Sequence, residues 1–153
     1  MIARDLLATA RRLATATQRK PKQADLRRAF STAYYALFHA LANDAANLLV
    51  GNRVKSLELA WTQTYRALNH GAAKSACEQI RQPRFPEAIC TTAKTFVILQ
   101  QRRHDADYDP ILRFTRGDAL AAIAMAEQAV ADMLSCETVD RRAFAVMLLL
   151  QRR

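Results

Sequence analysis

The fold is decided by one long stretch, residues 23–50, with the sequence QADLRRAFSTAYYALFHALANDAANLLV. Its apolar side chains recur every three or four residues, the spacing of one face of an α-helix. This face comprises Leu26, Phe30, Ala33, Tyr34, Leu37, Phe38, Leu41, Ala45 and Leu48. Gly51 and Asn52 follow, and either residue can adopt the positive φ that caps a helix C-terminus. We therefore expect one long helix over residues 23–50.

The same spacing predicts further helices on both sides of this stretch. They cover residues 2–18, 55–81, 87–104, 118–135 and 138–150. Gly71 lies inside the range 55–81, where it costs about 1 kcal/mol relative to Ala. Either a close helix crossing or a break in the helix would explain it. Asp109-Pro110 ends the helix before it, because a residue preceding proline disfavours the α conformation.

The predicted fold is all-α, an up-and-down bundle of five to six helices. Asp118 and Thr138 are the expected N-caps of the last two helices. The 153 residues suit a single domain over residues 1–153, with a bundle core of about 20–135 and a C-terminal helix of about 138–150. Only three Gly and four Pro occur, which argues against the many turns of a β-sandwich or barrel.

The charge is strongly basic, with 23 Lys and Arg against 14 Asp and Glu, a net charge of +9. Such an excess attracts polyanions, nucleic acid above all. The alternative is that the scattered arginines reflect an arginine-rich proteome and bind no ligand.

Within the hydrophobic part of the chain, Glu127 is enclosed by apolar neighbours, and an arginine from another helix is its expected partner.

The cysteines and the apolar runs indicate a cytoplasmic protein that does not enter a membrane. Cys77, Cys90 and Cys136 are odd in number and form no CxxC, so buried free thiols are expected. The longest apolar run, Ala143–Leu150, is too short to span a bilayer, but it is apolar nearly all round and must be buried by its own domain or a second subunit. No P-loop, GxSxG or HExxH occurs, and we expect no cofactor and no metal.

Three places hold polar residues among apolar ones. On the long helix, Ser31, Tyr35 and His39 lie four residues apart on one side and could contact phosphates or a base. The simpler interpretation is a core edge whose polar tips reach water.

The second place has Arg66, His70 and Lys74, again four residues apart, which suits anion binding or a solvated helix face. The third place is the segment 102–110, RRHDADYDP, which combines charges of both signs with an aromatic residue and a helix stop, and in which Arg103 and Asp107 would form an ion pair that orients Tyr108. A capped and ion-paired bundle end is the simpler alternative.

Two of these places together carry a resemblance. Residues 31–40, STAYYALFHA, resemble the S-x-A-Y-Y-A-x-F-H-A helix of the HEPN superfamily, the nucleotide-binding domain of higher eukaryotes and prokaryotes. Residues 103–108, RHDADY, resemble the R-x-x-A-D-Y segment of one uncharacterised bacterial branch. With the connecting helix at His70, the likeness covers roughly residues 20–135.

The resemblance implies a helical bundle that often forms homodimers. It also implies that the ligand is RNA or a nucleotide. The implied partner protein is a small nucleotidyltransferase of a toxin–antitoxin-type pair. HEPN nucleases share an Arg followed after four to six residues by His. The matching positions before His39, His70 and His104 hold Thr32–Tyr34, Gln63–Tyr65 and Val97–Leu99, so the nuclease motif is absent.

The leading hypothesis is therefore a HEPN-like module that binds RNA, a nucleotide or a partner protein without that nuclease motif. One alternative is a metal-independent endoribonuclease with a rearranged site of His39, His70 or His104 with Arg103. Another is a structural dimerisation protein that works through its C-terminal helix. No catalytic residue is assigned.

Overall fold

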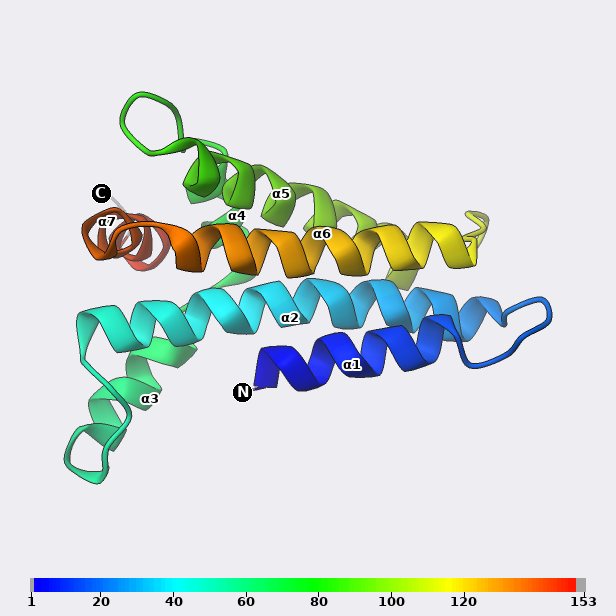
Figure 1. Cartoon of the computed structure of the whole chain (residues 1–153), viewed down its shortest axis with the longest axis horizontal. Coiled ribbons are helices and arrows are strands. Elements are labelled where there is room, and N and C mark those ends of the chain that lie inside the picture. Colours follow the sequence, from blue (N-terminus) through cyan, green and yellow to red (C-terminus); the bar gives the residue numbers. More distant parts are fainter. Residues whose placement is uncertain (1, 151–153) are drawn as a thin grey trace.

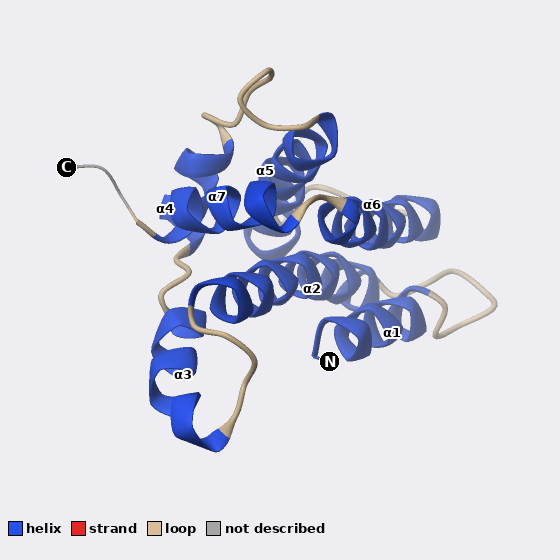
Figure 2. Cartoon of the chain, turned by 60° about the vertical axis from the view of Figure 1, so that its left-hand side comes forward, coloured by secondary structure: helices blue, strands red, loops and turns tan. Residues whose placement is uncertain are grey.

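The computed structural model describes residues 2–150, and within this range it contains helices and no strand. The elements are α1 (Ile2–Ala14), α2 (Gln23–Leu49), a short 3-10 helix η1 (Lys55–Leu57), α3 (Glu58–Arg66), α4 (His70–Cys77), α5 (Glu87–Tyr108), α6 (Arg116–Ser135) and α7 (Thr138–Leu149). Figures 1 and 2 show these elements arranged as a helical bundle. The predicted all-α fold is confirmed.

Helix α2 is the centre of the bundle. It packs against α1, α5 and α6 along its length, and against α3 and α7 near its C-terminus (Figure 1). The apolar face predicted from the sequence is the buried one, with Phe30, Tyr34 and Leu37 almost inaccessible to solvent. After α2, Gly51 adopts a φ of 116° and donates its N–H to Asn47 O at 3.0 Å, as expected of a C-terminal cap.

The predicted helix over residues 55–81 is wrong, because the chain leaves the helical path at residues 67–69 and forms α3 and α4 separately. Asn69 is the N-cap of α4, and its Oδ1 accepts the backbone N–H groups of Gly71 at 3.0 Å and Ala72 at 3.1 Å. Asn favours such caps over helix interiors because its side chain competes for backbone hydrogen bonds. The break thus precedes Gly71, the second residue of α4.

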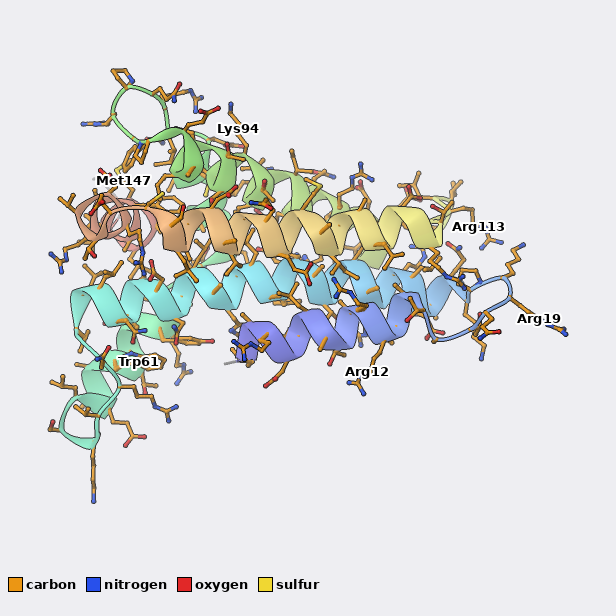
Figure 3. The ribbon with its side chains drawn as sticks, in the orientation of Figure 1. Arg12, Arg19, Trp61, Lys94, Arg113 and Met147 are labelled. Atoms are coloured by element: carbon orange, nitrogen blue, oxygen red, sulfur yellow. The ribbon has the colours of Figure 1, made fainter. Side chains whose placement is uncertain are left out.

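Helix α3 projects from the bundle and rests mainly on α2 (Figure 2). Its attachment includes Trp61, whose position is labelled in Figure 3. The indole is nearly buried and donates Nε1–H to Asn47 Oδ1 at 2.8 Å.

Other helix ends differ from the prediction by a few residues. Helix α1 ends at Ala14 rather than at residue 18, and α5 continues past residue 104 to Tyr108. Asp118 is not the N-cap of α6: Thr115 is, and the two residues form a reciprocal capping box. Thr138 is the first residue of α7 rather than its cap.

Several arginines are used to hold the fold together. Arg27 donates to the carbonyls of Ala106 at 2.8 Å and Asp109 at 2.7 Å, which ties α2 to the end of α5. Arg116 donates to the carbonyls of Ala14, Thr17 and Arg19 in the α1–α2 connection. Part of the basic excess is therefore structural.

Ion pairs between helices account for more of this charge. Arg141 of α7 forms an ion pair with Asp44 of α2, a carboxylate that is only 7% exposed. The expected arginine partner of Glu127 is Arg11, at 2.7 Å, and this pair is largely exposed. Helix α7 buries Phe144, Ala145 and Leu148 and leaves Val139 and Val146 exposed, so its apolar surface is only partly covered.

Between residues 2 and 150, no helix combines the length and apolar character needed to cross a membrane. All three cysteines are free, and Cys77 and Cys90 are buried while Cys136 is half-buried. Burial raises the pKa of the Cys77 thiol to about 12, so this sulfur is protonated and inert near neutral pH.

Candidate functional site

Three helices bring six of the predicted site residues into one cluster. They are Ser31, Tyr35 and His39 of α2, His70 of α4, and Arg103 and Asp107 of α5. We call this set the His–Arg cluster. It joins residues that are distant in sequence, because α5 packs on α2 and α4 packs on α5, so that the His70 ring reaches Phe38 of α2.

Helix α2 contributes one side of the His–Arg cluster, as its four-residue spacing predicts. Ser31 Oγ donates to Asp107 Oδ2 at 3.4 Å, near one end of the cluster. At the other end, His39 Nδ1 lies 2.5 Å from the hydroxyl of Tyr65 on α3, and the two rings are stacked. The ring of Tyr35 lies between, 6.4 Å from that of His39 and 5.7 Å from that of His70.

His70 is held from three directions at the start of α4. Its Nδ1 lies 2.6 Å from the hydroxyl of Tyr34, and its ring stacks on Phe38 with the centroids 4.2 Å apart. Gln100 of α5 donates its side-chain amide to the backbone carbonyl of His70 at 3.2 Å. The imidazole therefore has a fixed position although it is only half-buried.

Arg103 is only loosely paired. Its Nη1 lies 3.4 Å from Asp107 Oδ2, longer than the 2.7–2.9 Å or so of a strong charge-assisted bond. Its guanidinium carbon lies 5.4 Å from the ring centre of Tyr34 and 5.9 Å from that of Tyr35, within the range of cation–π attraction. Its Nε is buried without a hydrogen-bond partner, and so is Oε1 of Gln100, one turn earlier. Arg103 thus retains unused hydrogen-bonding capacity.

Both histidines of the His–Arg cluster favour the neutral state. Burial lowers the pKa of His39. For His70, burial lowers the pKa most, and repulsion by the charge of Arg103, and by His39 when that ring is protonated, lowers it further. Burial raises the pKa of the Tyr34 and Tyr65 hydroxyls, so both phenols remain protonated and can donate.

These states determine what the two imidazoles can do. A tyrosine hydroxyl that donates to Nδ1 leaves Nε2 carrying the ring proton, whereas the opposite arrangement leaves a lone pair on Nε2. Among residues 2–150, no hydrogen-bond partner occupies Nε2 of His39 or of His70. Each ring can therefore offer a donor or an acceptor to a ligand.

The remaining predicted site residues lie outside the His–Arg cluster. Arg66 ends α3 and is exposed, while His70 and the half-buried Lys74 stay one turn apart on α4. The predicted stripe is therefore wrong for Arg66, because the break at residues 67–69 separates it from the other two. His104 and Tyr108 pair with each other, their ring centres 4.9 Å apart. The predicted ion pair of Arg103 and Asp107 exists, but the ring contact recorded for Tyr108 is His104.

Four residues at the cluster were not among the predicted site residues: Tyr34, Phe38, Tyr65 and Gln100. The first two were assigned to the apolar face of α2. Periodicity can identify such a face, but it cannot show that a hydroxyl at its edge meets a histidine from another helix.

In the described part of the chain, no three His, Cys, Asp or Glu side chains are grouped so that they could hold a metal ion. The chain matches no protein-family model, no curated protein and no solved structure with which it was compared.

Proposed function

We propose that this chain is a HEPN-like helical module that binds RNA, with the His–Arg cluster as the contact for a phosphate. The observation that carries the proposal is the convergence of Arg103 with His39 and His70 from three helices. Two imidazoles and a guanidinium are all hydrogen-bond donors for phosphate oxygens. The resemblance of residues 31–40 and 103–108 to HEPN motifs makes RNA or a nucleotide the preferred ligand class.

The state of Arg103 supports this proposal. A guanidinium recognises phosphate through several N–H groups arranged in a fork. In the present arrangement its one ion pair, between Nη1 and Asp107, is long at 3.4 Å. A phosphate that approached the Nη groups of Arg103 would supply shorter hydrogen bonds than Asp107 does.

The charge of the whole chain supports a polyanion as the ligand. Arg27, Arg116 and Arg141 are engaged with carbonyls or a carboxylate, but exposed cations remain around the molecule, such as Arg12, Arg19, Lys94 and Arg113 in Figure 3. Nonspecific attraction by such residues would concentrate RNA near the surface, and the His–Arg cluster would then select a phosphate.

The test is a binding titration of fluorescently labelled single-stranded RNA in EDTA, at about 50 and about 200 mM salt. We expect affinity to fall steeply with salt and Arg103→Gln to weaken binding clearly more than Arg12→Gln. Arg12 is the matched control because it is an exposed arginine on α1. Arg103→Lys separates charge from geometry, since it keeps the cation but loses the fork. Equal losses in Arg103→Gln and Arg12→Gln would show that only overall charge matters and would refute the site.

A second candidate function is metal-independent RNA cleavage, favoured by two neighbouring histidines whose Nε2 atoms have no partner among residues 2–150. One imidazole would take the proton of the ribose 2′-hydroxyl as it attacks the neighbouring phosphorus. The other, in its protonated imidazolium form, would give a proton to the departing 5′-oxygen, so that a 2′,3′-cyclic phosphate and a 5′-hydroxyl result. Arg103 would stabilise the charge on the phosphorane.

The same RNA incubated with the protein in EDTA distinguishes the two candidates. Cleavage products that disappear in both His39→Ala and His70→Ala, but persist in His104→Ala, would establish the enzymatic function at this cluster. Binding without cleavage would leave the module as the function. His104 is the matched control because it lies outside the His–Arg cluster.

A further inference from the structure

One aromatic side chain differs from all the others. Of the Phe, Tyr and Trp residues in the described chain, Tyr108 alone is exposed, with 67% of its surface accessible. The others are buried in the core or half-buried in the His–Arg cluster and its surroundings. An aromatic ring left in water next to a candidate ligand site is available to stack on a planar group.

Tyr108 lies at the C-terminal end of α5, the helix that also carries Arg103 and Asp107 of the His–Arg cluster. The ring of His104, one turn earlier, lies 4.9 Å away at an interplanar angle of 49°, and gives Tyr108 a neighbour on the same surface. Most of the Tyr108 ring remains open to solvent.

The charges around Tyr108 are of both signs. The carboxylates next to it are Asp107, weakly paired with Arg103 at 3.4 Å, and Asp109, which accepts the backbone N–H groups of Ile111 and Leu112. The pKa of Asp109 is lowered mainly by its hydrogen bonds with the backbone N–H groups of Leu112 and Ile111. The positive charge of nearby Arg27 lowers this pKa further. Exposed cations lie at this end of the bundle, where Figure 3 shows Arg19 and Arg113.

From this arrangement we infer that Tyr108 is a stacking site for a nucleobase, and that the ligand of the module is single-stranded RNA. The inference rests on the proposed RNA-binding function and adds to it the state of the RNA. Bases of a duplex are stacked on one another and cannot reach a side chain, whereas an unpaired base can lie on Tyr108 while its phosphate contacts Arg103. Phosphate and base would thus be recognised by neighbouring surfaces of α5.

The experiment measures RNA binding by wild-type protein and by Tyr108→Ala and Tyr108→Phe variants. We expect Tyr108→Ala to weaken binding of a single strand about 5- to 150-fold, the range of base–aromatic stacking. Tyr108→Phe should retain wild-type affinity, because the ring remains. The salt dependence should be the same in all three proteins, since no charge is changed. A duplex of the same sequence should bind equally to wild type and Tyr108→Ala.

Two controls isolate the base from the backbone. The first is a strand of the same length without bases, for which Tyr108→Ala should make no difference. The second is Ile111→Ala, which removes an apolar side chain that is 84% exposed but has no ring; it should change affinity by less than about twofold. Because Tyr108 is exposed at a helix end, unfolding is not expected, and circular dichroism checks this.

The outcomes separate this inference from the proposed function. If wild-type protein binds no RNA, the proposed function and this inference both fail. If binding depends on Arg103 but not on Tyr108, only the stacking site is refuted, and the exposed ring serves another purpose, such as contact with a protein. An equal effect of Tyr108→Ala on the strand without bases would also refute stacking.

Discussion

The hydroxyl of Tyr34 and Nδ1 of His70 lie 2.6 Å apart, which joins the core of α2 to the first residue of α4. Tyr34 is fully buried, so its position is determined by core packing, while His70 is half-exposed in the His–Arg cluster. The hydrogen bond therefore fixes the position of an imidazole that a ligand can reach, because its partner is held by the packed core.

Removing the Tyr34 hydroxyl should lower the stability of the protein and also leave the His70 ring less firmly positioned. Tyr34→Phe is expected to lower the free energy of unfolding by about 1 kcal/mol, the net contribution of one such hydrogen bond. It should also weaken RNA binding, because the His70 ring can then rotate. Urea unfolding measures the first effect. The matched control is Tyr35→Phe, whose hydroxyl has no hydrogen-bond partner among residues 2–150, and it should stay within about 0.5 kcal/mol of wild type. Equal destabilisation in both variants would contradict the prediction.

The two ion pairs between helices should differ greatly in their effect on stability. Arg141→Ala leaves Asp44 buried without its partner and should destabilise the protein by about 3 kcal/mol. Arg11→Ala removes the partner of Glu127, but both of these side chains are largely exposed, so the cost should be under about 1 kcal/mol. Chemical denaturation of the two variants tests this order. A loss for Arg11→Ala as large as that for Arg141→Ala would show that burial does not decide the energy here.

The histidines of the His–Arg cluster should make stability depend on pH. Burial lowers the pKa of His39, and burial together with Arg103 and His39 lowers that of His70, whereas unfolded histidine has a pKa of about 6.5. Below about 6.5 the unfolded chain therefore binds more protons than the folded chain. The free energy of unfolding should be highest above about pH 6.5 and fall as the pH drops through the folded-state pKa values.

Urea unfolding at about pH 7.5 and about pH 5.5 tests this dependence. Wild type should lose stability at the lower pH, and the double variant His39→Asn/His70→Asn should lose less. The variant His104→Asn is the control, because it removes a histidine that lies outside the cluster. If the double variant shows the same loss as wild type, the pH dependence arises elsewhere.

How much of the site could be predicted differs from helix to helix. The side of α2 that carries Ser31, Tyr35 and His39 followed directly from the sequence, because helical geometry places residues four apart on one side. The ion pair of Arg103 and Asp107 followed for the same reason. The stripe of Arg66, His70 and Lys74 did not, because it assumed a continuous helix across Asn69.

The residues of the third predicted helix show why local pattern was insufficient there. Apolar spacing over residues 55–81 suits either one long helix or two short ones. The backbone donors of Gly71 and Ala72 take Asn69 Oδ1 as their acceptor, which begins a second helix at His70. That small change turns His70 toward Tyr34 and Phe38 instead of placing it in line with Arg66.

The sequence by itself determined the fold class and the buried face of α2, since both depend on spacings within one helix. Only the tertiary structure decided that His39, His70 and Arg103 form one cluster, that Tyr34 and Tyr65 bond to its histidines, and that Tyr108 stays in solvent. These relationships depend on how separate helices pack against one another. Packing is set by the fit of many side chains at once, and no local spacing encodes it.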